Sequence, residues 1–203
     1  MEFLKIILLS LLAAIGYGIL HDLVTAHVCV EYFTVGHPPI FRTESPVLLA
    51  LGWGVLATWW VGIILGIPLA GIARIGTWPK LSVKALIGPL LILLAVSGVM
   101  ATVAGFIGYA IDSPRESWVA FLMGPALSSQ IAPERRPLFF ADLCAHNVSY
   151  FVGFVGGIAV WVYAIIWRWR KSRPRQQEPE TSSTFRRSSV LKRPTHQPGP
   201  PVG

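Results

Sequence analysis

Long apolar stretches alternate with short polar segments along this chain. The apolar stretches cover about residues 3–20, 46–72, 85–111 and 138–167. Each is near or above the length of about 20 residues that an apolar helix needs to cross a bilayer. The pattern therefore predicts an all-α membrane protein in which four transmembrane helices form a compact bundle.

Features inside the stretches refine this prediction. The first stretch resembles a signal peptide, but its small-x-small pattern around Ala13 and Gly16 is poor, so we expect it to be retained as an anchor. Pairs of small residues four apart, such as Gly62 with Gly66 and Gly153 with Gly157, predict faces where helices pack closely. The two halves show no matching interruptions, so a transporter-like broken helix is not expected.

The composition agrees with a membrane location and removes several other classes. Of the 203 residues, 53% are hydrophobic and 13% are charged, which excludes a soluble globular domain of this length. Two cysteines are too few for a disulfide framework. There is no Walker loop, dinucleotide fingerprint or G-x-S-x-G elbow, so no soluble-enzyme motif indicates an activity.

Basic residues are placed unevenly between the polar segments. Of the 17 Lys and Arg residues, only Arg42, Arg115, Arg135 and Arg136 lie in the first and third connections. The others lie before or early in the first span, in the second connection, or from Arg168 onward. Because basic segments stay cytoplasmic, both termini are expected inside and the first and third connections outside.

The sequence predicts two regions: a transmembrane domain over residues 1–171 and a tail over residues 172–203. The tail is rich in Pro, Ser, Arg and Gln, so it cannot bury enough apolar surface to fold and is expected to be disordered and cytoplasmic. Its first basic residues are expected to attract anionic lipids, and no nucleic-acid partner is expected. These basic residues are Arg168, Arg170, Lys171, Arg173 and Arg175.

Candidate chemistry is concentrated on the predicted outer side. Imidazole and carboxylate side chains follow the first span and recur where the fourth begins, and together they suit a transition metal such as zinc or iron. Asp142 and His146 are four residues apart, so one helix face would present both. The candidate ligands are His21, Asp22, His27, Glu31, His37, Asp142 and His146.

The same residues also allow alternatives to a metal site. None of the spacings matches a known ligand signature, and the same residues suit a hydrogen-bonded polar cap that stabilises the bundle or docks a protein partner. A ligand or proton pathway is a further alternative. Whether the chain is an enzyme is therefore undecided, as is whether the stretch from His27 to Glu31 is helical or strand-like.

The two cysteines allow three interpretations. Cys29 follows the first span and Cys144 lies near the start of the fourth, so they predict neighbouring helix ends and a disulfide if their Cα atoms lie within about 7 Å. Buried free thiols and a thiolate metal ligand are the other two interpretations.

Two motifs carry a resemblance to a known group of proteins. The run H-D-x-V-T-A-x-V-C-V-E-Y-F-T-x-x-H-P, from His21 to Pro38, resembles a motif of uncharacterised bacterial integral membrane proteins. The stretch A-D-L-C-A-H-N, from Ala141 to Asn147, is similar to part of the same pattern. The resemblance implies a multi-pass protein of the bacterial inner membrane and implies no activity.

The third connection, residues 112–137, is less informative. Trp118 and the apolar residues after it predict a short interfacial helix that ends before Gly124, or alternatively a lid over the polar cap. Glu134, Arg135 and Arg136 are interpreted as solvated charges at the start of the fourth span.

Overall fold

A computed structural model describes residues 1–112 and 118–173, which form helices joined by short connections. Of the predicted tail over residues 172–203, residues 174–203 lie outside the described residues. Residues Met1–Ser172 form one compact unit. Its elements are α1 (Glu2–Val28), α2 (Val30–Thr34), α3 (Pro46–Leu56), α4 (Trp59–Arg74), α5 (Val83–Ile111), α6 (Trp118–Met123), α7 (Pro125–Ser128), the 3-10 turn η1 (Pro133–Arg135) and α8 (Arg136–Ser172).

Four segments are long and apolar enough to cross a membrane, as the sequence predicted. They are Glu2–Val28, Pro46–Arg74, Val83–Ile111 and Pro133–Ser172. The first and last are longer than predicted, because α1 continues through His21 and Asp22 and α8 runs from Arg136 to Ser172. His21 and Asp22 therefore belong to the first span itself, as Asp142 and His146 belong to the fourth.

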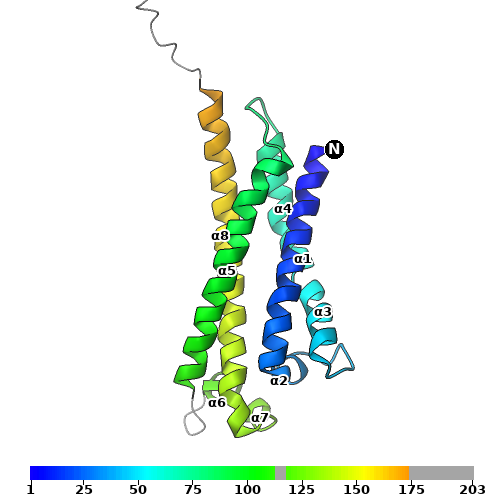
Figure 1. Ribbon diagram of the computed structural model, residues 1–203, viewed down its shortest axis with the longest axis vertical. Coiled ribbons are helices and arrows are strands. Elements are labelled where there is room, and N and C mark those ends of the chain that lie inside the picture. The colour runs from blue at the N-terminus through cyan, green and yellow to red at the C-terminus, as the bar shows by residue number, and fades with distance from the viewer. Residues whose placement is uncertain (113–117, 174–203) are drawn as a thin grey trace, which may run out of the picture. The chain divides into compact units, whose positions relative to one another are not determined.

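The long helices pack side by side as two pairs. α1 packs against α3 and α4, while α5 packs against α8 along their length. The N-terminus, the connection from α4 to α5 and the last turn of α8 lie at one end of the bundle (Figure 1). The short helices α2, α6 and α7 lie at the other end, which we call the cap end.

Glycines bring α1 into backbone contact with the second span. A Cβ added to Gly54 would lie 2.6 Å from the backbone of Ile19, and one added to Gly62 would lie 2.7 Å from Leu11. The predicted packing face of Gly62 and Gly66 is therefore confirmed. Gly153 differs, because a Cβ there would meet nothing within 4 Å.

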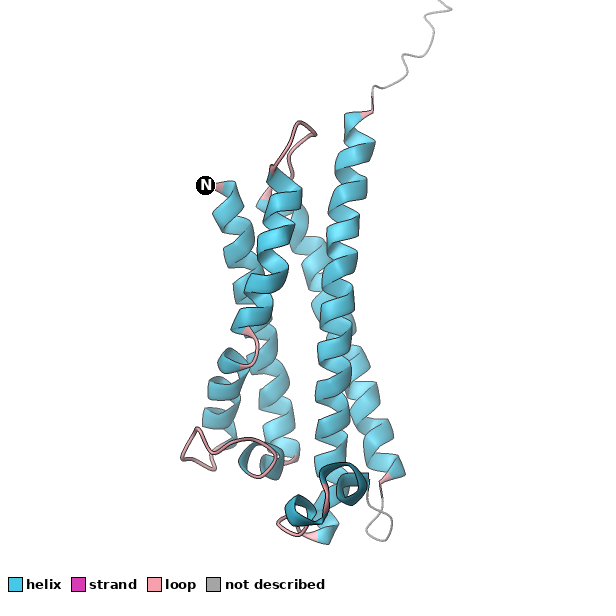
Figure 2. Cartoon of the chain, turned by 180° about the vertical axis from the view of Figure 1, so that it is seen from behind, coloured by secondary structure: helices cyan, strands magenta, loops and turns pink. Residues whose placement is uncertain are grey.

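The second span is interrupted, contrary to the expectation of continuous helices. α3 ends at Leu56 and α4 begins at Trp59, with a turn at Ala57 and Thr58 between them (Figure 2). The hydroxyl of Thr58 donates to the carbonyl of Gly54, which satisfies one backbone group at the break. A side-chain hydroxyl can satisfy a backbone group that a helix break leaves free, so the break is tolerated inside an apolar span. The hydropathy of the span does not reveal the interruption.

Arg168 corrects the assignment of the basic cluster that follows the last span. The side chain is buried and its guanidinium donates to the carbonyls of Ile72, Trp78 and Pro79. It ties α8 to the end of α4 and to the connection between α4 and α5, and it is not available to lipid head groups. The lipid contact expected for the rest of the cluster stays a prediction.

Candidate metal centre

The cap end is built by a sharp turn at the end of α1. The helix stops at Cys29, whose extended backbone (φ −145°, ψ 94°) also starts α2. The stretch from His27 to Glu31 is therefore two helices with a corner between them, and the strand-like alternative is wrong. The corner lets the side chains of α2 fold back over the interior face of α8.

Three candidate ligands converge where α1 meets α8. His21, Asp22 and His146 each offer one ligand atom, and these atoms all lie within 4.8 Å of one another. His146 Nε2 lies 3.2 Å from Asp22 Oδ1. Asp22 and His146 are 5% and 2% exposed, so the group lies in the bundle interior and not on a wetted surface.

A backbone carbonyl of its own helix selects the tautomer of a neutral His146 ring. Its Nδ1 donates to the carbonyl of Asp142 at 2.8 Å, so a neutral ring presents the lone pair of Nε2 to Asp22. Two hydrogen-bond acceptors that lie 3.2 Å apart, as His146 Nε2 and Asp22 Oδ1 then do, need a shared proton or a cation between them. Metal-binding histidines usually donate their second nitrogen to a backbone carbonyl or carboxylate in this way.

His21 adds a nitrogen whose hydrogen-bonding capacity is unused. Its Nε2 is buried and has no hydrogen-bond partner in the described structure, although the ring packs edge-on against His146 with centroids 4.5 Å apart. Leaving such an atom unpaired is costly. Donors bound to one tetrahedral zinc lie about 3.4 Å apart, so a small movement of the His21 ring would complete a three-residue site.

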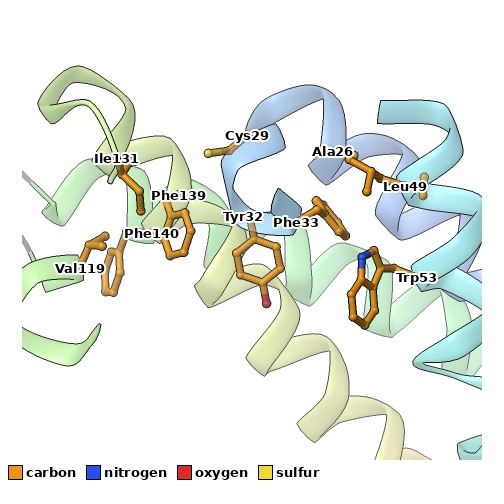
Figure 3. Close-up of a cluster of buried hydrophobic side chains, with 11 residues drawn as sticks. Ala26, Cys29, Tyr32, Phe33, Leu49, Trp53, Val119, Ile131, Phe139 and Phe140 are labelled. Atoms are coloured by element: carbon orange, nitrogen blue, oxygen red, sulfur yellow. The ribbon is translucent and has the colours of Figure 1, made fainter. Parts of the chain in front are cut away.

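Aromatic side chains from α2 cover this group. The ring of Tyr32 stacks on His146 with centroids 4.4 Å apart, and Phe33 packs against the same imidazole. Figure 3 shows Tyr32 and Phe33 side by side under α2, between Phe139 on one flank and Trp53 on the other. The aromatic cover excludes water and fixes the plane of the His146 ring.

An ion pair holds this cover in place. Both carboxylate oxygens of Glu31 accept from Arg135 at 2.9 Å, and Arg135 also donates to the carbonyl of Val28. Hydrogen bonds from Arg135 lower the pKa of Glu31 to about 2. Glu31 is therefore engaged by Arg135, which is not merely a solvated charge as the sequence had suggested.

The remaining predicted ligands point elsewhere. His27 is exposed, and its Nδ1 donates to the carbonyl of Leu23. His37 donates to the carbonyl of Tyr32 and packs against Trp53, and burial lowers its pKa. Asp142 is buried with Oδ2 unpaired, and its contact with His146 goes through its carbonyl and not its carboxylate. The carboxylate that meets His146 is that of Asp22.

The two cysteines, both within the described residues, are free thiols, so the structure does not contain the predicted disulfide. Cys29 Sγ donates to Glu31 Oε2 at 3.3 Å, whereas Cys144 faces Gly108 of α5. Burial and the neighbouring Glu31 raise the pKa of Cys29 to about 12, which disfavours a thiolate ligand there.

Some residues of the site carried no signal in the sequence. Tyr17 stacks on His21 one turn earlier in α1, and its hydroxyl lies 2.8 Å from that of Ser149 on α8. This contact extends the polar group deeper into the bundle. Tyr17 looked like one more apolar-span residue, and only its spacing of four from His21 placed it on the same helix face.

Comparisons with known proteins add no identification. No family model, no curated protein and no solved structure matches this chain.

Proposed function

We propose that this chain is a multi-pass membrane protein that binds one divalent transition-metal ion, zinc or iron, through His21, Asp22 and His146. The observation that carries the proposal is the buried Nε2 of His21 without a hydrogen-bond partner, in a residue whose ligand atom lies within 4.8 Å of ligand atoms of Asp22 and His146. Neutral imidazole and carboxylate are common ligands of these metals, and buried polar groups at membrane depth are functional candidates.

The number of protein ligands favours a catalytic or substrate-binding site over a structural one. Structural zinc sites hold four protein ligands, whereas catalytic sites hold three and leave a position for water or a substrate. Only His21, Asp22 and His146 form such a group among the described residues. The basic-residue pattern supports a plasma-membrane location with cytoplasmic termini and the metal near the outer surface.

The competing function is structural. His146 and Asp22 at 3.2 Å also suit an imidazolium–carboxylate pair that holds α8 to α1 without any metal. Such a pair could stabilise the bundle or shape a surface for another membrane protein. It leaves Nε2 of His21 unexplained, and for that reason we prefer the metal.

Metal content distinguishes the two functions. Purified protein would be loaded with zinc, freed of excess metal, and analysed for bound zinc per chain. We expect one zinc in the wild type and in His27→Ala, and loss of that zinc in His21→Ala and His146→Ala. His27 is the matched control because it lies on α1 but is exposed. Absence of stoichiometric zinc or iron in the wild type would favour the structural function.

A further inference from the structure

A cavity lies directly beneath the candidate metal centre. It has a volume of about 510 Å³ and lies between α1, α4, α5 and α8. His21 and Asp22 line one end, while Ser10 lines the wall of α1 further along. Ser10 and Asp22 are 12 residues apart, which corresponds to about 18 Å along a helix, so the cavity is elongated.

The lining combines an apolar body with a few unpaired or bridging polar groups. Most of it is formed by Leu, Ile, Val, Ala and Gly residues. Ser97 of α5 also lines it, and its side chain is 1% exposed with an Oγ that has no hydrogen-bond partner. An apolar wall with a few placed polar groups is typical of a small-molecule site, and the volume is in the usual range of about 300–1,000 Å³.

The cavity reaches the surface that faces the lipid. Trp60 and Ile64 of α4, and Tyr150 and Phe154 of α8, line its edge while remaining about half exposed. A molecule that enters between these helices comes from the bilayer and not from water. The occupant must therefore be soluble in the membrane.

We propose that this cavity binds a single-chain lipid, with the chain along α1 and an anionic oxygen of its head group at the metal. Two neutral imidazoles, one carboxylate and a divalent ion carry a net charge of +1, which attracts an oxyanion to the open coordination position. The inference rests on the proposed metal site for the head-group contact, whereas the chain contact depends only on the cavity.

Three glycines offer matched variants for a test. A Cβ added to Gly153, Gly16 or Gly88 would meet nothing within 4 Å, so each position accepts a larger side chain. Gly153 lines this cavity, and Gly16 lines a separate groove of about 910 Å³ on the other side of His21. Gly88 lines neither of them. Leucine at Gly153 therefore fills the cavity, and the other two variants are controls.

The experiment measures binding of a fluorescent long-chain fatty acid to full-length protein in nanodiscs, by energy transfer from tryptophan. Trp60 and Trp161 line the cavity and serve as donors. We expect Gly153→Leu to weaken binding by about tenfold or more, the equivalent of roughly two buried CH₂ groups, with Gly88→Leu and Gly16→Leu unchanged. Zinc loading should tighten binding to the wild type and not to His146→Ala.

Each part of the proposal would be overturned by a different result. Equal affinity in Gly153→Leu and the wild type, or a loss in Gly16→Leu instead, would overturn the assignment of the chain to this cavity. Unchanged affinity when the wild type carries stoichiometric zinc would overturn the head-group contact. Failure of the metal proposal itself appears separately, as a wild type that retains no metal, and the glycine variants still decide the cavity.

Discussion

Two buried polar groups lie at opposite ends of the bundle, and they differ in how completely they are paired. At one end, Arg168 donates to the carbonyl of Ile72 in the last turns of α4 and to those of Trp78 and Pro79 in the connection to α5. At the cap end, His21 Nε2 and Asp142 Oδ2 are buried without a partner. Buried polar atoms are normally paired, so the full pairing of Arg168 indicates a structural role, whereas the unpaired Nε2 of His21 favours the proposed metal.

Removing Arg168 should have the largest effect on stability. Arg168→Met removes three hydrogen bonds made by a buried charged group, and such bonds contribute about 1.5–3 kcal/mol each, so we expect a loss of about 3 kcal/mol or more in the free energy of unfolding. Zinc content should remain that of the wild type. The control is Arg170→Met on the exposed face of α8, which should unfold like the wild type. Loss of zinc in the folded Arg168 variant would show that the metal site depends on the hydrogen bonds at the other end of the bundle.

Removing the charge of Asp22 at the cap end should have the opposite effects: a small change in stability and a large loss of zinc affinity. Asp22→Asn preserves shape, so the stability of metal-free protein should change by less than about 1 kcal/mol while zinc affinity falls by at least about 100-fold. Asp142→Asn is the matched control, and its zinc affinity should stay within about tenfold of the wild type. Isothermal titration with zinc measures both. The reverse ranking would restore Asp142 as the ligand.

The pair of Glu31 and Arg135 should give a smaller, pH-dependent effect. The pKa of Glu31 is lowered from 4.5 to about 2, so its stabilisation is complete above pH 4.5 and is lost as the pH falls toward 2. Because both side chains are partly exposed, we expect no more than about 1 kcal/mol. The difference in unfolding temperature between the wild type and Glu31→Gln, measured from pH 6 to pH 2, should shrink through that window. A constant difference would show that the ion pair does not hold α2.

Two buried serines should show the smallest effect, and they compare a paired hydroxyl with an unpaired one. The hydroxyl of Ser10 donates to the carbonyl of Ile6, whereas that of Ser97 has no partner. Ser10→Ala should therefore cost about 1 kcal/mol, and Ser97→Ala should be neutral or slightly stabilising in lipid-free protein. Thermal unfolding of the two variants in detergent tests this. A larger loss in Ser97→Ala than in Ser10→Ala would contradict it.

The sequence predicted the four spans because length and hydropathy fix them locally. It also brought the end of α1 and the start of α8 to one end of the bundle, since antiparallel spans leave no other arrangement. It could not predict that Asp22 and not Asp142 meets His146, because that choice depends on the register between two helices. The i, i+4 spacing suggested the wrong pair, since the imidazole uses that spacing to reach the backbone carbonyl.

Arg168 is a second residue whose contacts the sequence does not reveal. It lies two residues before Arg170 in a basic run, and nothing local distinguishes a residue that faces carbonyls from one that faces lipid. The break at Ala57 and Thr58 was equally invisible, because an apolar stretch of 29 residues fits a straight helix or two shorter ones. Each of these features is set by tertiary contacts that hydropathy does not encode.

X-ray absorption of the zinc-loaded protein identifies the atoms bound to the metal and therefore tests the three-residue site itself. We expect nitrogen and oxygen ligands at about 2.0–2.2 Å with scattering from two imidazoles in the wild type. His21→Ala, loaded at a zinc concentration high enough to fill the weakened site, should show one imidazole. Sulfur at about 2.3 Å, or the same imidazole count in wild type and variant, would contradict it.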